Sequence, residues 1–245
     1  ILRVPFLALF LCNYFKIIFR KDTNMRLRFF LLLLISSLGY MTQAQGESDL
    51  LKYREDQFYV SFSMIFQKES INEFRQNGFS NNLQFGFLRD IPLNKEGDLA
   101  IAMGLGYSLD KLVSNLNLDN DKQSNFSFSI LDNEQNSLKV SSLVLPFEFR
   151  WRTSTVNKTD FWRFYAGFKY KINLNSHFNY FLGGNTKVNF VRKENTALYL
   201  SLGYNTWNLL IEYDLNNIYN RSITFTDGSN LKVRSIKIGL IFYIL

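Results

Sequence analysis

Apolar and polar positions alternate along most of the chain from residue 57 onward. The clearest stretch is Leu99–Leu109, where large apolar side chains occupy one face and Ala, Gly and Ser occupy the other. A repeat of two residues is that of a β-strand, whose successive side chains point to opposite faces. Helical spacing is hard to find in the same region. The pattern therefore predicts an all-β fold.

Eight alternating segments follow one another, and such segments are near the roughly 9–11 residues that cross a bilayer at a tilt. They cover residues 58–66, 83–87, 99–109, 143–151, 162–172, 198–204, 209–215 and 236–244. Long polar connections occupy 67–78, 110–139, 174–195 and 216–232, and shorter ones occupy 90–97, 153–160 and 205–206. Outer-membrane barrels have long loops at one end and short turns at the other. Residues 57–245 are therefore predicted to form an eight-stranded antiparallel transmembrane β-barrel with short periplasmic turns and long extracellular loops.

Alternation alone does not decide which face meets lipid, because a soluble lipocalin-like barrel would put the apolar face inside. The small residues of the second face of Leu99–Leu109 suit the crowded interior of a narrow membrane barrel better than a solvated surface. Charged residues on the same face of other strands are expected to pair in a polar lumen, since an unpaired buried charge is costly. This predicted lumen network comprises Glu148, Arg150, Arg152, Arg163, Lys169, Lys171, Glu212, Asp214 and Lys237.

All three Trp residues stand beside short connections. Trp151 and Trp162 flank one of them, and Tyr204 and Trp207 flank Asn205-Thr206, which has the length of a two-residue hairpin turn. Amphipathic rings collect at membrane interfaces, so these four aromatic residues are predicted to form a periplasmic girdle. Ordinary cross-strand aromatic pairing is the alternative explanation.

The chain ends on a pattern of alternating residues that resembles the signal by which outer-membrane barrels are recognised for assembly. Lys237, Gly239, Phe242 and Ile244 are its predicted elements, and the barrel assembly machinery is the implied partner. Pro146 interrupts this otherwise regular picture, because it stands inside a strand and has no N–H to donate. A bulge or a local break in pairing is expected there.

The N-terminal region reads differently from the rest. Residues 25–44 combine two arginines, an apolar run and a small-residue cleavage pattern, which predicts a secretory signal peptide and export to the cell outer membrane. Residues 45–56 would then form a periplasmic N-terminal segment. Residues 1–24 are expected to be upstream translation that is absent from the mature protein, the alternative being a membrane anchor.

The net charge and the candidate metal-binding and catalytic residues narrow the classes of function that the sequence allows. The net charge is +7, but residues 1–44 hold six of the 28 basic residues and one of the 21 acids, which leaves 22 and 20. This balance gives no reason to expect nucleic-acid binding. Cys12 is the only cysteine, and neither a metal-ligand cluster nor a cofactor motif is present in the sequence. Ser176 and His177 are adjacent polar residues in a predicted loop, and no catalytic site or enzymatic activity is expected.

Three segments carry a family resemblance: Leu145-Pro-Phe-Glu-Phe-Arg-Trp151, Phe161-Trp-Arg-Phe-Tyr-Ala-Gly-Phe168 and Ile238-Gly-Leu-Ile-Phe242. With the signal peptide and the eight strands, they resemble the PorT-like outer-membrane β-barrels of Bacteroidetes over residues 25–245. The resemblance implies an accessory, non-enzymatic role in type IX protein secretion, with outer-membrane lipid and other secretion-system proteins as partners. A narrow channel, or a barrel for surface ligand binding or adhesion, is the alternative.

Overall fold

The computed structural model describes residues 56–69, 73–94, 96–120, 126–131, 134–153, 162–204, 206–220, 223–224 and 230–244. All of them belong to one compact unit, Asp49–Leu245. The predicted signal peptide, the upstream segment 1–24 and residues 45–55 lie outside the described residues. No helix among the described residues is long and apolar enough to cross a membrane.

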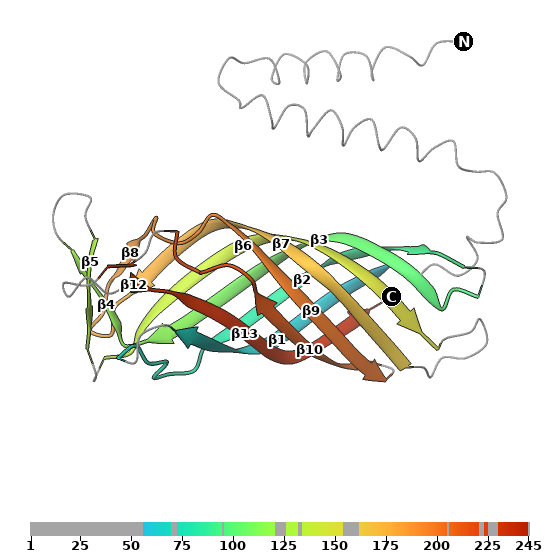
Figure 1. Cartoon of the computed structure of the whole chain (residues 1–245), viewed down its shortest axis with the longest axis horizontal. Helices are drawn as coiled ribbons and strands as arrows, with labels where there is room; N and C mark the ends of the chain where they lie inside the picture. The colour runs from blue at the N-terminus through green and yellow to red at the C-terminus, as the bar shows by residue number, and fades with distance from the viewer. Residues whose placement is uncertain are drawn as a thin grey trace, which may run out of the picture. The chain divides into compact units, whose positions relative to one another are not determined.

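Eight long strands form the body of the protein. They are β1 (Gln57–Glu69), β2 (Asn81–Pro92), β3 (Leu99–Ser114), β6 (Asn136–Arg152), β7 (Trp162–Asn179), β9 (Glu194–Tyr204), β10 (Trp207–Asp214) and β13 (Val233–Ile244). Each pairs antiparallel with its neighbour along the chain, and β13 pairs with β1. This pairing closes the sheet into a barrel (Figure 1), which confirms the predicted fold class.

The two ends of the barrel differ. The short connections between β2 and β3, β6 and β7, and β9 and β10 lie at the end that also holds the C-terminus, here called the turn end. The opposite end, here called the loop end, carries the shorter strands (Figure 1). These are the hairpin of β4 (Leu116–Asn120) and β5 (Phe126–Ile130), β8 (Asn185–Lys187) paired to β7, and β11 (Ile223–Thr224) paired to β12 (Asn230–Leu231).

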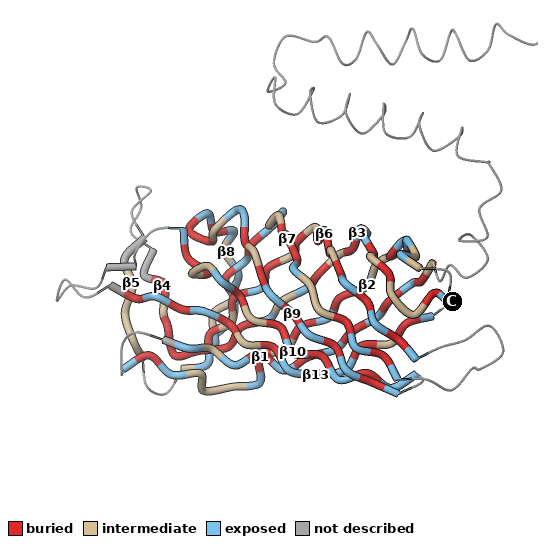
Figure 2. The backbone as a smooth tube through the Cα atoms, turned by 45° about the vertical axis from the view of Figure 1, so that its right-hand side comes forward, coloured by how far each residue is buried: buried red, intermediate tan, exposed pale blue. Residues whose placement is uncertain are grey.

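Burial alternates along every long strand (Figure 2). The large apolar side chains of these strands are the exposed ones and therefore point outward. On β1, Phe58 is 61% exposed, whereas the neighbouring Tyr59 and Ser61 face inward and are buried. A water-soluble barrel would bury its apolar face, so this orientation excludes the lipocalin-like arrangement. All eight long strands contribute exposed apolar side chains to this outward face, which we call the apolar band.

Several strands are longer at the loop end than the sequence predicted. β3 continues to Ser114, β6 begins at Asn136 and β7 continues to Asn179, so parts of the predicted loops 110–139 and 174–195 are strands. His177 therefore lies on β7 and not in a loop. The alternation persists in these extensions, but the inward residues become apolar, which hid the strands from a search for apolar outward faces.

Pro146 lies where the sequence led us to expect irregular pairing. The β3–β6 ladder runs to the Met103–Phe147 pair and resumes at the Gly106–Val144 pair, so Pro146 falls in the gap. The opposite edge of β6 pairs Pro146 with Lys169 on β7, and the register of that ladder shifts only later, next to Ser142. The gap in the β3–β6 ladder therefore accommodates the missing N–H of Pro146.

Candidate functional site

Two arginines and two carboxylates form a cluster inside the barrel near its turn end. Arg150 donates from Nη1 to Asp90 Oδ1 at 3.0 Å and from Nε to Glu148 Oε2 at 2.8 Å. Arg152 donates from Nη2 to Asp90 Oδ2 at 2.9 Å and from Nε to the carbonyl oxygen of Gly97 at 2.7 Å. All four charged side chains are fully buried. Charge-assisted bonds of this kind are among the stronger hydrogen bonds in proteins.

Glu212 is the centre of a second cluster, halfway along the interior. Lys169 donates from Nζ to Glu212 Oε2 at 2.7 Å, and Lys171 bonds both Glu212 and Asp214, the latter at 2.8 Å. Lys237 Nζ lies 3.6 Å from Glu212 Oε1. Lys237 Nζ also lies 2.8 Å from Oδ2 of Asp110, on β3. Three lysines from two strands therefore share one carboxylate.

Aromatic rings cover the charged groups on the inward side. The guanidinium of Arg150 lies 4.8 Å from the ring centre of Tyr165 and 5.6 Å from that of Tyr243. Lys169 Nζ lies 4.4 Å from the ring centre of Tyr199. A Cβ at Gly106 would lie 2.1 Å from the hydroxyl of Tyr59, so the small residue on β3 makes room for that ring. Desolvated cations gain from such ring faces, which helps to hold charge in the barrel.

The structure places all nine residues of the predicted lumen network on inward faces, where each is buried. It divides them into two clusters, with Glu148 beside Arg150 and with Glu212 and Asp214 among three lysines. Arg163 pairs with Arg152 across the β6–β7 ladder.

Two carboxylates of the interior escaped sequence reasoning, because each lies just past the end of a predicted strand. The sequence pattern predicts a short connection that begins at Asp90 and a long loop that begins at Asp110. Asp90 bonds both arginines of the first cluster, and Asp110 accepts from Lys237 at 2.8 Å. Continuing the period of two through Leu88 on β2 and Ser108 on β3 would have placed both inward.

The loop end contains an apolar cluster in place of charges. Fifteen buried residues pack together there, and we call this cluster the apolar cap. They come from β1, β3, β4, β6, β7, β12, β13 and the segments between strands. Its members are Ile65, Phe74, Leu112, Leu116, Leu118, Leu138, Val140, Phe178, Val188, Phe190, Val191, Ile218, Tyr219, Leu231 and Val233. Burial in the cap raises the pKa of the Tyr219 hydroxyl, because the phenolate would lose its hydration.

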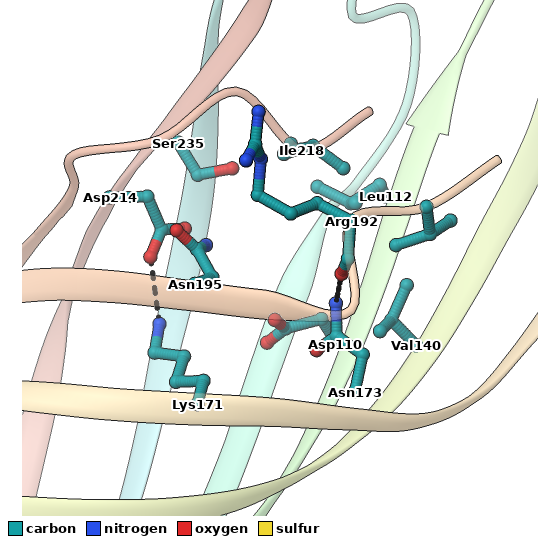
Figure 3. Close-up of a pocket in the computed structure, with 11 residues that line it drawn as sticks. Asp110, Leu112, Val140, Lys171, Asn173, Arg192, Asn195, Asp214, Ile218 and Ser235 are labelled. Carbon is teal, nitrogen blue, oxygen red and sulfur yellow. Dashed lines mark hydrogen bonds and ion pairs between the residues drawn. The ribbon is translucent and has the colours of Figure 1, made fainter. Parts of the chain in front are cut away.

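A small cavity separates the charged interior from the apolar cap (Figure 3). Asp110, Lys171 and Asp214 line its polar side, and Leu112 and Ile218 line its apolar side. The cavity has a volume of about 20 Å³, which is room for about one water molecule. The interior between the two regions is therefore almost filled by side chains.

The predicted girdle residues Trp151, Trp162, Tyr204 and Trp207 point outward at the turn end, and each is exposed. Trp162 and Tyr204 pair across β7 and β9 with ring centres 5.3 Å apart. Tyr204 and Trp207 pair directly, as in a hairpin with a two-residue turn. Both the girdle and simple cross-strand pairing fit this arrangement.

The residues of the predicted assembly signal all lie on β13, which closes the barrel. Lys237 points inward to Asp110, whereas Phe242 points outward and packs against Trp207 with ring centres 5.3 Å apart. Gly239 is constrained by packing, because a Cβ there would lie 2.0 Å from the carbonyl oxygen of Phe62. Ile244 is exposed at the last described position of the strand. Recognition by an assembly machinery stays a prediction.

Ser176 and His177 are neighbours on β7 and point to opposite faces. Ser176 is buried and His177 is exposed. Adjacent strand residues diverge in this way, so the two side chains are not arranged as a nucleophile and its base. Among the described residues, no group of three or more His, Cys, Asp or Glu side chains is arranged to hold a metal ion.

A closed antiparallel barrel with an apolar exterior and a charged interior defines the class of transmembrane β-barrels. Residues 43–244 match the sequence model of the family described as "Outer membrane protein beta-barrel domain". The chain belongs to this outer-membrane β-barrel family, and its location is the outer membrane.

Two solved structures of Ail, the attachment invasion locus protein of Yersinia pestis, are similar to this chain at 13% sequence identity. The alignment with the structure of Ail in complex with the heparin analogue sucrose octasulfate spans 78% of this chain and 99% of the Ail chain, with a TM-score of 0.31. The alignment with the second crystal structure of Ail spans 77% of this chain and 99% of the Ail chain, with a TM-score of 0.32. A search of curated proteins found no match.

Proposed function

We propose that the protein is a non-enzymatic, non-conducting accessory barrel of the outer membrane, which acts by holding a partner protein at its loop end. The filled interior carries this proposal. The Glu212 cluster and the apolar cap block the barrel at two successive levels, with a cavity of about 20 Å³ between them. Barrels of eight strands commonly have interiors that side chains fill.

The turn between β7 and β8 supplies a candidate contact for a partner. Phe181 is 57% exposed and Leu182 is 85% exposed at its tip. The tip is held in place, because the Phe181 N–H donates to Asn136 Oδ1 at 2.8 Å and the Tyr180 N–H donates to the Gly184 carbonyl at 3.2 Å. Gly183 and Gly184 have φ values of 99° and 96°, which favour glycine. An exposed apolar anchor on a fixed turn is a frequent feature of binding surfaces.

Cross-linking in outer membranes tests the partner proposal. The wild-type chain should capture a protein that the Phe181→Ser/Leu182→Asp variant captures much less. Lys193→Gln, a substitution of another exposed residue at the loop end, should capture it as well as wild type. Equal capture by both variants would remove the tip from the proposal.

A narrow channel is the second candidate, and the charged interior supports it. Conductance in planar bilayers separates the two functions. The proposal predicts no step conductance from the refolded barrel. Regular single-channel steps would favour the channel.

The finer role in type IX secretion rests on the resemblance to PorT-like barrels in segments such as Leu145–Trp151. A deletion strain should fail to export type IX substrates, and re-expression of the full chain should restore export. Normal export without the protein would contradict this role and would leave the accessory barrel to serve another partner.

A further inference from the structure

A row of basic residues crosses four neighbouring strands at the loop-end edge of the apolar band. Lys111 on β3 pairs with Lys139 on β6, Lys139 pairs with His177 on β7, and His177 pairs with Lys187 on β8. All four side chains are exposed. Directly paired residues share a face and have Cβ atoms about 4.5–5.5 Å apart. We call these four residues the basic row.

The charge of the basic row is not balanced by an ion pair among the described residues. Asp110 is next to Lys111 on β3, but its carboxylate already pairs with Lys237. Like charges placed directly opposite one another destabilise a sheet. Within the part of the chain that the structure describes, none of the ion pairs includes Lys111, Lys139 or Lys187. The inward lysines differ, since each of them contacts a carboxylate. The arrangement is therefore suited to an anion that comes from outside the chain.

Two grooves on the outer face lead away from the row toward the turn end. The first has a volume of about 510 Å³ and a mixed lining, in which Lys111, Lys139, His177 and the carboxylate of Asp110 lie near the apolar side chains of Leu83 and Leu109. The second has a volume of about 410 Å³ and is lined almost wholly by apolar side chains, among them Phe85, Leu105 and Leu143. Tyr107 lines both grooves, so the two lie next to each other on β3.

We propose that this surface binds a phosphate-bearing lipid of the leaflet that surrounds the loop end. The ammonium groups of Lys111 and Lys139 would hold the headgroup phosphate, and the acyl chains would lie along the groove of Leu105 and Leu143. Charge complementarity selects an anionic headgroup, because lysine binds phosphate as a point charge. The outward position of the grooves selects a lipid and not a soluble ion, because exposed apolar residues of the apolar band, such as Leu105 and Leu83, line them.

Native mass spectrometry of the full-length protein in a neutral detergent tests the proposal, with diphosphorylated lipid A as the probe. Wild type should retain the lipid, and phosphatidylcholine should not bind comparably. Each basic side chain near an anionic lipid is worth about 5-fold in affinity. Lys111→Gln/Lys139→Gln should therefore bind lipid A about 25-fold more weakly. Lys193→Gln, which removes an exposed lysine at the same end but outside the row, should bind like wild type.

Thermal unfolding gives a second test, because the difference in unfolding temperature between Lys111→Gln and wild type should change sign when lipid A is added. In neutral detergent, Lys111→Gln should unfold at a higher temperature than wild type, because it relieves the repulsion with Lys139. With lipid A present, the same variant should unfold at a lower temperature than wild type, because it loses ligand stabilisation. Equal binding of lipid A by wild type and the double variant would overturn the proposal. Equal binding of dephosphorylated lipid A, or displacement of the lipid by millimolar inorganic phosphate, would also overturn it.

Discussion

Along the same strands, the inward and outward faces have opposite polarity near the turn end and near the loop end of the barrel. Near the turn end of β6, Glu148 and Arg150 point inward while Phe149 points outward. Near the loop end of that strand, Val140 points inward and Lys139 points outward. The polarity of both faces reverses together on β3, where the outward residues change from Leu109 to Lys111 and the inward residues change from Asp110 to Leu112.

This reversal indicates which part of the barrel is surrounded by lipid and which part is surrounded by water. Apolar burial is favourable only where the alternative is water, so it can stabilise the apolar cap but not the part surrounded by lipid. In that part, charged side chains face inward because lipid cannot hydrogen-bond them. Two stabilising mechanisms therefore operate in one continuous sheet, ion pairs around Glu212 and apolar packing around Leu112.

Glu212→Leu should give the largest loss of stability. It leaves Lys169 without its carboxylate and Lys171 with Asp214 alone. Breaking a buried network from one side costs about 3–5 kcal/mol. The midpoint of unfolding in denaturant should fall accordingly, whereas Glu96→Leu at an exposed turn should change the free energy of unfolding by less than about 0.5 kcal/mol. Equal midpoints for Glu212→Leu and wild type would contradict a network centred on Glu212.

Leu112→Ala tests the apolar cap by ordinary packing. Deleting a buried leucine side chain costs about 2–5 kcal/mol. The effect should be measured by hydrogen exchange, with faster exchange at the loop end and little change near Arg150. Ser108→Ala, four residues earlier on the same inward face, is the matched control. Uniform acceleration along the whole strand would show that the cap and the charged interior unfold as one unit.

Leu105→Arg tests the outward face, where Leu105 is 53% exposed and central in β3. Arginine at the bilayer midplane costs about 2–4 kcal/mol and much less near the interfaces. Refolding into lipid vesicles should reveal this cost, and Tyr107→Arg, closer to the loop end, should cost less. A cost that is independent of depth would argue against lipid contact.

Trp207→Ala should give the smallest effect, at the turn end. It removes the edge contact with Phe242, and such aromatic pairs contribute about 0.5–1.5 kcal/mol beyond their buried area. If the ring also anchors the protein at the membrane interface, the loss should be larger in vesicles than in detergent micelles. Equal losses in both would favour simple cross-strand pairing over a girdle.

Period-two alternation was sufficient to predict the eight strands, and the small and charged residues of the second face were needed to predict that the apolar face points outward. It worked because the apolar band demands large side chains at every second position, as along β3 from Leu99 to Leu109. It was also sufficient to place Glu212 and its lysines inward. The sequence could not reveal that Lys237 reaches Asp110, since β13 and β3 are not neighbours in the sheet.

The apolar cap was missed for a different reason. Leu138 and Val140 alternate with polar outward residues, which is the pattern of a soluble sheet, and a search for apolar outward faces assigned them to a loop. Phe190 and Ile218 lie outside the long strands, so no periodicity indicates them. A reversal of polarity along a continuous strand is the signal that would have found the cap.

Site-directed spin labelling on β3 tests the central claim, the joint reversal of both faces, most directly. Single cysteines would replace Leu105, Lys111 or Leu112 in a Cys12→Ser background, since Cys12 is the only cysteine. The label at 105 should be reached by oxygen dissolved in lipid and shielded from a water-soluble nickel reagent. The label at 111 should be reached by the nickel reagent, and the label at 112 should be shielded from both. Nickel access at 105, or equal access at 111 and 112, would contradict the reversal.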